Sequence, residues 1–216
     1  MTRADDLSMI GVVTITDRSS RAGATAAASK RAQRFEEIVN AAWAIAHEQG
    51  LGAMTLHEVA RRVGLRQPSL YVYVESKLDL YDAMFAQANA ELLARVERAG
   101  ESGSAREQLL RLSRVVLDFA VEDPARQQLL FTRSIPGFAP SAQSYALAEQ
   151  LVQRTSRLLA ELGCGSPQQA DVFTALIAGL SAQQIANEPG GDRWTRHLEP
   201  LLELFLDHFP DPSEPR

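Results

Sequence analysis

From Arg31 onward, apolar residues recur every three or four positions along most of the chain. The first such stripe contains Phe35, Ile38, Ala42, Ile45 and Ala46, the spacing of an amphipathic helix that ends near Gln49 and Gly50. Similar patterns predict further helices at 55–63, 67–74, 76–96, 105–121, 124–133, 141–162, 167–187 and 193–209. No segment of useful length alternates apolar and polar residues as a strand would. The pattern therefore predicts an all-α protein.

Several residues between these patterns are typical of helix ends. Thr55 and Glu58 have the spacing of a capping box, in which the hydroxyl and the carboxylate both accept from backbone N–H groups at a helix start. Gly64 can adopt the left-handed conformation that ends a helix, and Pro68 stands where a first-turn N–H is not needed. Ser76 is expected to cap the fourth helix. Two short helices joined by a tight turn are thus expected between 55 and 74, the arrangement of a helix-turn-helix.

The second of these short helices has an outward face suited to reading DNA. Leu70 and Val74 are expected to anchor it, and the residues left facing outward are Gln67, Ser69, Tyr71 and Val72. In a helix-turn-helix this helix enters the major groove. Glutamine can pair bidentately with adenine, the rings of proline and tyrosine can contact a thymine methyl, and serine can donate to phosphate. Tyr73 and Lys77, which flank this surface, are expected to position the helix rather than to specify bases.

The stretch from Phe35 to Phe85 resembles the N-terminal domain of the tetracycline-repressor (TetR) family. The resemblance rests on Thr55, the link Ala60–Leu65, the aromatic segment Leu70–Val74 and the pair Ser76–Lys77. It implies a homodimer whose two recognition helices read a palindromic operator in double-stranded DNA. It also implies a divergent C-terminal helical domain that binds a small-molecule effector, whose chemistry and binding residues stay unknown. The residues assigned to DNA contact are Thr55, Arg66, Gln67, Pro68, Ser69, Tyr71, Tyr73 and Lys77.

Charge is distributed unevenly along the 216 residues. The chain carries 22 Lys and Arg against 27 Asp and Glu, a net charge of −5, but residues 1–80 hold 10 basic and 9 acidic side chains. Only two of the basic residues are lysines, so phosphate neutralisation is expected to depend on Arg61, Arg62, Arg66 and Lys77. A solvated face of the second helix is the alternative for Arg61 and Arg62. Val72 also departs from the larger or polar residue of many relatives, which leaves base preference there open.

Other classes of function find little support in the sequence. There is no GxSxG, no P-loop and no dinucleotide-type glycine run, and the four histidines are scattered, so we expect no enzyme, no cofactor and no metal site. The single cysteine, Cys164, is interpreted as a passive thiol in a reducing, cytoplasmic setting. The apolar run Met9–Ile15 is too short to span a membrane and lacks the basic flank of an export signal. A helical binding module without DNA activity is the remaining alternative.

The expected domain organisation has four parts. Residues 1–30 form a flexible arm, 31–80 the helix-turn-helix domain, 81–210 the effector-binding and dimerisation domain, and 211–216 a disordered tail. A basic arm that touches DNA through Arg18, Arg21 and Lys30 is the alternative for the first part.

Two features of the C-terminal domain carry further expectations. Dimerisation is expected through the last two long helices, where small residues allow close approach: Ala175, Gly179 and Ala182. Pro200 is expected to kink the final helix. Large or polar side chains are candidates to line an effector pocket, and a place in the core or at the surface is the alternative for each: Phe119, Phe131, Phe138, Tyr145, Phe173, Arg133 and Gln150.

Overall fold

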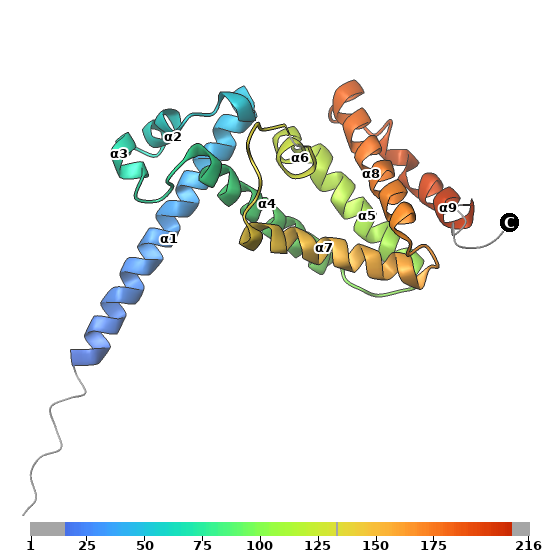
Figure 1. Cartoon of the computed structure of the whole chain (residues 1–216), viewed down its shortest axis with the longest axis horizontal. Helices are drawn as coiled ribbons and strands as arrows, with labels where there is room; N and C mark the ends of the chain where they lie inside the picture. The colour runs from blue at the N-terminus through green and yellow to red at the C-terminus, as the bar shows by residue number, and fades with distance from the viewer. Residues whose placement is uncertain (1–15, 133, 209–216) are drawn as a thin grey trace, which may run out of the picture.

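A computed structural model of the chain describes residues 16–132 and 134–208, and every regular element in these ranges is helical (Figure 1). The α-helices are α1 (Thr16–Gln49), α2 (Leu56–Arg62), α3 (Gln67–Leu70), α4 (Lys77–Ala99), α5 (Ala105–Glu122), α6 (Pro124–Phe131), α7 (Ala142–Glu161), α8 (Pro167–Asn187) and α9 (Leu198–His208), with 3₁₀ turns at Leu51–Ala53 and Thr195–His197. The predicted all-α fold is confirmed. None of the described helices is both long enough and apolar enough to cross a membrane.

The main difference from the expected elements lies at the N-terminus. The apolar stripe begins near Arg31, but α1 already begins at Thr16. Five of the residues from 22 to 28 are alanine, the residue with the highest helix propensity, so this segment forms a helix without an apolar face. Half of the segment expected as an arm is therefore helical. Residues 1–15 and 209–216, which include the rest of the arm and the expected tail, lie outside the described residues.

The helices form a small N-terminal unit and a larger C-terminal one, joined by α4 (Figure 1). In the small unit α2 packs against α1 and α3. The helix α4 packs against α1 at one end and along α5 and α7 over the rest of its length, and α5 packs against α8. A displacement of α4 would thus change packing contacts in both units.

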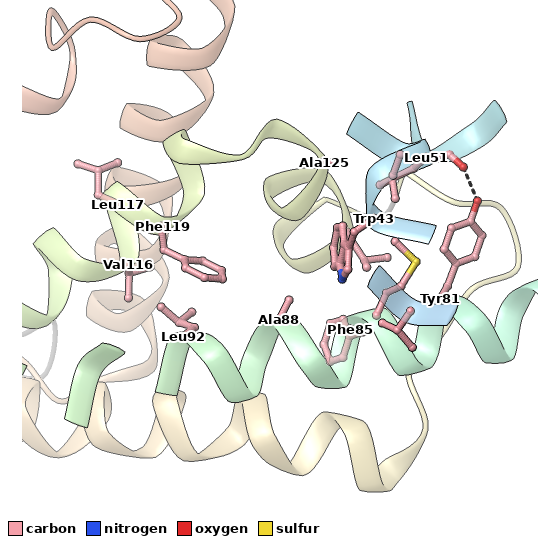
Figure 2. Close-up of a cluster of buried hydrophobic side chains, with 14 of the residues drawn as sticks. Trp43, Leu51, Tyr81, Phe85, Ala88, Leu92, Val116, Leu117, Phe119 and Ala125 are labelled. Carbon is pink, nitrogen blue, oxygen red and sulfur yellow. Dashed lines mark hydrogen bonds between the residues drawn. The ribbon is translucent and has the colours of Figure 1, made fainter. Parts of the chain in front are cut away.

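The two units share one apolar core. Figure 2 shows Trp43 and Leu51 of the small unit facing α4, which contributes Tyr81, Phe85 and further apolar side chains along one face. The same stripe of α4 meets Phe119 of α5, which is fully buried. Because buried apolar residues of both units belong to this one cluster, their packing transmits changes between the units.

The C-terminal helices differ from expectation at Pro200. The predicted kinked helix 193–209 is instead a 3₁₀ turn followed by α9, and Pro200 stands in the first turn of α9. The missing N–H costs nothing there, because first-turn N–H groups have no partner within the helix. Pro200 therefore helps to start a helix rather than kink one. Between α7 and α8, Cys164 is buried, with 3% of its surface exposed.

Candidate DNA interface

The short helix α3 is the second helix of the helix-turn-helix. Gly64, in the turn before it, has the predicted positive φ, at 68°. The backbone N–H groups of Tyr73 and Val74 both donate to the Leu70 carbonyl, at 2.9 and 3.2 Å, so the chain continues on a helical path for a turn beyond α3. Leu70 and Val74 are buried as predicted. They fix which side of this segment faces outward.

The outward side carries the residues predicted to read bases. Tyr71 and Val72 are 48% and 62% exposed, a large exposure for such apolar side chains. Pro68 and Ser69 are exposed as well, and Gln67 is half-buried. The Gln67 side-chain amide donates to the Tyr71 hydroxyl across one turn, at 3.4 Å. The segment therefore presents a partly exposed ring beside an amide.

The predicted flanking residues are held by the protein itself. Tyr73 is half-buried and packs against the core. Lys77 Nζ donates to the Gly52 carbonyl at 3.0 Å and lies 5.5 Å from the centre of the Tyr81 ring. By contrast, Arg66, which precedes α3, is exposed. Its side chain makes no hydrogen bond or ion pair with a described side chain, so its guanidinium is available to a partner.

The start of α2 differs in part from the predicted capping box. Thr55 Oγ accepts from the Glu58 N–H at 3.2 Å, as expected. The Glu58 carboxylate does not accept from the backbone N–H of Thr55. It instead accepts two hydrogen bonds from Arg61, at 2.9 and 2.6 Å, and these lower the pKa of Glu58. A charged guanidinium is a stronger partner for a carboxylate than a backbone N–H.

The arginine pair predicted to neutralise phosphates is already engaged. Arg61 pairs with Glu58, and Arg62 makes two hydrogen bonds to Glu48, at 2.9 and 2.6 Å, which lower the pKa of Glu48. Exposed ion pairs of this kind contribute little to stability, because water and salt screen them. The arrangement favours the alternative of a solvated face for these two residues.

Two arginines of α1 that no sequence pattern had singled out hold the helix-turn-helix in place. Arg34 Nη2 donates to the Val63 carbonyl at the end of α2, at 2.6 Å, and Arg31 Nη2 donates to the Val72 carbonyl at the end of the recognition segment, at 3.0 Å. A cation at the C-terminal end of a helix is favoured by the helix dipole. The two contacts span 29 and 41 residues, and no local pattern points to contacts of that range.

A cavity of about 230 Å³ lies in the C-terminal unit between α5, α7 and α8. Of the candidate lining residues, Phe131 and Phe173 line it. Phe119 is instead in the core, and Phe138 packs edge-on against Tyr81 and Phe85. Tyr145 and Gln150 are exposed and do not line the cavity, and Arg133 lies outside the described residues. The prediction was wrong where large side chains fill the core rather than border a void.

A groove runs between α8 and α9 on another side of the same unit. Its floor includes the small residues Ala175 and Gly179 and its edges include Trp194 and Leu204, the last 56% exposed. Ala182, the third predicted small residue, is exposed on α8 but does not line the groove. This surface combines small residues with exposed apolar side chains.

A polar cluster connects the two units at the N-terminus of α6. His47 of α1 hydrogen-bonds Asp123, the N-cap of α6, through Nε2 and Oδ2 at 2.7 Å. Arg126 of α6 pairs with Asp123 at 3.1 Å and with Glu91 of α4 at 2.9 Å. The start of α6 therefore touches both α1 and α4.

The N-terminal unit is, by this geometry, a helix-turn-helix DNA-binding domain of the kind that presents one short helix to the major groove. The sequence profile of the family described as bacterial regulatory proteins, tetR family, matches residues 38–84, which span α2, α3 and the ends of α1 and α4 that pack on them. Residues 38–84 thus form a DNA-binding domain of the TetR-family type.

Known proteins resemble the chain beyond this domain. An HTH-type transcriptional regulator of Mycobacterium bovis is 27% identical over 154 residues, which cover 68% of this chain and 66% of that protein's length. A TetR/AcrR-family regulator from Thermobifida fusca has the same fold over 83% of this chain and all of its own, with a TM-score of 0.59 and 23% identity. FadR from Bacillus subtilis, solved in complex with stearoyl-CoA, matches over 80% of this chain and 98% of its own, with a TM-score of 0.58 and 16% identity.

Proposed function

We propose that the protein is a ligand-responsive transcriptional repressor that binds a palindromic operator in double-stranded DNA as a homodimer. The observation that carries this proposal is the exposed face of the recognition segment. Tyr71 and Val72 are apolar and exposed, yet Arg31 of α1 holds this segment in a fixed position. Fixed, exposed apolar side chains beside a glutamine are suited to contact base edges. A helical binding module without DNA activity would not need them.

The residues of this surface take different roles in the proposal. Gln67, Pro68, Ser69 and Tyr71 read the major groove, whereas Arg66 and Lys77 contact phosphates. Lys77 donates one of its three N–H groups to Gly52, which leaves two for a phosphate and fixes where the cation stands. Thr55 and Tyr73 hold the helices in register with the groove.

The test is an operator titration with the full chain, on a site first selected from random duplexes. Tyr71→Ala is expected to weaken specific binding about ten-fold or more and to leave non-specific binding nearly unchanged, because it removes base contacts worth on the order of 1 to 3 kcal/mol. Lys77→Ala is expected to weaken binding to every sequence and to reduce its salt dependence. Selection that yields no preferred sequence would refute sequence-specific regulation and favour the module without DNA activity.

The homodimer is proposed to form through α8 and α9. Gly179 and Ala175 let a second helix approach closely, and the exposed Leu204 would be covered by the partner, giving a four-helix bundle across a two-fold axis. Two recognition helices related by that axis would meet half-sites about one helical turn apart or somewhat more. Sedimentation at micromolar concentration is expected to give a dimer, and Gly179→Glu is expected to give a monomer that loses operator binding. A wild-type monomer at that concentration would contradict this interface.

Effector binding is proposed to act through α6 and α4. The cavity is bordered by Phe131, the last residue of α6, and the start of the same helix holds His47 and Glu91 through Asp123 and Arg126. A ligand shifts operator affinity only if it prefers one arrangement of these contacts over another. We propose that the preferred arrangement moves the two recognition helices out of register with successive major grooves.

A further inference from the structure

We propose that the cavity between α5, α7 and α8 takes a small, uncharged, mostly apolar compound that carries a hydrogen-bond donor, such as a substituted phenol or an alcohol of similar size. The inference rests on the proposed function, since it names the chemical class of the effector to which the repressor would respond. It follows from three properties of the cavity: its charge, the direction of its hydroxyl groups and its volume.

The cavity wall is uncharged throughout its described residues. Its apolar part comes from Leu112 and Val116 of α5, Leu151 and Leu159 of α7, and Phe173 and Ile177 of α8. No Lys, Arg, His, Asp or Glu is among the described residues that border it. A carboxylate or an ammonium group buried here would lose its hydration without gaining a counter-charge, which costs far more free energy than apolar burial returns. The wall therefore selects against ions of either sign.

The hydroxyl groups on the wall offer acceptors rather than donors. Ser113 donates its proton to the Leu109 carbonyl at 2.7 Å, and Thr155 donates to the Leu151 carbonyl at 2.9 Å. Thr174 and Ser181 do the same on α8, at 2.8 and 3.0 Å. Each hydroxyl still has lone pairs that face no described donor. The fifth hydroxyl, on Ser156, is on an exposed residue at the rim.

A surplus of acceptors over donors discriminates among uncharged ligands. The backbone N–H groups of helix interiors are already used within the helices, so among the described residues of the wall a further donor comes from the Ser156 hydroxyl at the rim. A ligand O–H or N–H finds a partner on these serines and threonines, whereas a carboxylate, which only accepts when ionised, does not. A phenol or an alcohol thus matches the cavity better than its methyl ether, and much better than the corresponding acid.

The volume sets the size of the ligand. The cavity measures about 230 Å³, which is larger than an engineered cavity of about 150 Å³ that binds benzene and smaller than the roughly 300 to 1,000 Å³ of sites for drug-sized ligands. One ring with a few substituents fits this space. A long acyl chain with an anionic head, as in the stearoyl-CoA complex of FadR, exceeds this volume and would find no counter-charge on the wall.

The rim links the ligand to the proposed regulation. Phe131 and Val152 border the cavity and are largely exposed, so the ligand would enter between the end of α6 and α7. A ligand covered by Phe131 would contact the C-terminal end of α6. The N-terminal end of α6, about two turns away, contacts His47 of the DNA-binding domain. The short helix α6 would thus contact both the ligand and the DNA-binding domain.

The proposal is tested with 4-methylphenol, 4-methylanisole and 4-methylbenzoate at pH 7, three probes of nearly one shape. Binding to the full chain is measured by thermal shift and calorimetry, and its effect by operator titration. We expect 4-methylphenol to raise Tm and to weaken operator affinity, the methyl ether to bind several-fold more weakly, and the benzoate to bind about 100-fold more weakly or not at all. Ala170→Leu, which fills the cavity, is expected to abolish binding of the phenol, and Ala146→Leu, on the exposed side of α7, is expected to leave it unchanged.

Each outcome decides a distinct part of the inference. Benzoate binding as tight as that of the phenol, or a phenol that raises Tm equally in Ala170→Leu, would overturn the chemistry assigned to the cavity. A phenol that binds wild type but leaves operator affinity unchanged would overturn the effector role. Failure of the proposed function itself is seen separately, as absence of operator binding without any ligand, and the binding measurements still decide the cavity chemistry in that case. No rise in Tm at millimolar concentrations of any probe would overturn the proposal.

Discussion

The helix-turn-helix end and the cavity end of this chain are stabilised in opposite ways. At the helix-turn-helix end, side chains from other helices donate to backbone carbonyl groups: Arg34 to Val63 after α2, Arg31 to Val72 after α3, and Lys77 to Gly52 in the turn after α1. At the cavity end, hydroxyls such as those of Ser113 and Thr155 donate within their own helices, and the helices meet through apolar side chains. The first arrangement keeps a surface exposed but fixed, and the second leaves a volume unfilled. Substitutions at the two ends should therefore differ in kind and in size.

The largest expected effect separates the filled core from the cavity wall. Phe119→Ala removes a fully buried ring that lies about 5 Å from the guanidinium groups of both Arg95 and Arg126, and we expect it to lower the free energy of unfolding by about 3 to 5 kcal/mol. Phe173→Ala should cost clearly less, because one side of this ring already faces a void and loses fewer contacts. Urea denaturation of both variants measures the difference. Equal losses would mean that the cavity wall is as well packed as the core.

The next effect concerns Tyr81, whose hydroxyl donates to the Leu51 carbonyl between α4 and the turn after α1. Tyr81→Phe should lower the free energy of unfolding by about 1 to 2 kcal/mol at pH 7, because it removes a buried hydrogen bond. Burial also raises the pKa of Tyr81. The unfolded chain then releases this proton near pH 10, before the folded chain does, so wild-type stability should fall as pH rises above about 10.

Comparing urea midpoints at pH 7 and pH 10.5 isolates this contribution. The variant should lose less stability than wild type over that interval, since it has no hydroxyl to titrate at this site. An identical loss in both proteins would show that Tyr81 does not contribute to the loss of stability at alkaline pH.

The smallest expected effect on stability comes from the arginines of α1. Arg34→Ala should lower the free energy of unfolding by only about 0.3 to 1 kcal/mol, the usual value of a partly exposed cation at a helix C-terminus. It should nevertheless weaken operator binding, because α2 loses a contact that fixes its end. Arg34→Lys should restore part of the affinity, and Arg98→Ala, in the last turn of α4, serves as the control. Unchanged operator affinity in Arg34→Ala would show that α2 needs no such contact.

Most helices and their ends could be predicted from the sequence because they depend on local rules. Thr55 and Ser76 cap α2 and α4, and Gly64 takes the positive φ that ends α2, as expected from residue type alone. The start of α1 was not predicted, since an alanine-rich helix has no apolar stripe. Pro200 was misread because its effect depends on whether the helix has already begun.

The candidate sites could be predicted only as far as their residues act alone. The outward direction of Tyr71 followed from its spacing to Leu70 and Val74. The partners of Arg31, Arg34 and Arg62 could not be predicted, because choosing among several nearby carboxylates and carbonyls requires the tertiary arrangement. The pair between Arg61 and Glu58 is local, three residues apart on α2. The cavity wall was predicted poorly for a related reason. It is made mainly of ordinary aliphatic residues, which look the same in sequence whether they meet a neighbour or a void.

The buried Cys164 gives the protein a built-in kinetic reporter. It is the single thiol of the chain, and its backbone N–H donates at 2.8 Å to the carbonyl of Leu159, a residue that also lines the cavity. A maleimide or disulfide reagent can reach this thiol only when the segment between α7 and α8 opens locally. The rate of modification of unaltered protein therefore measures how often this segment opens. Any compound seated against Leu159 should slow that rate in proportion to its occupancy, without a dye, a tag or DNA.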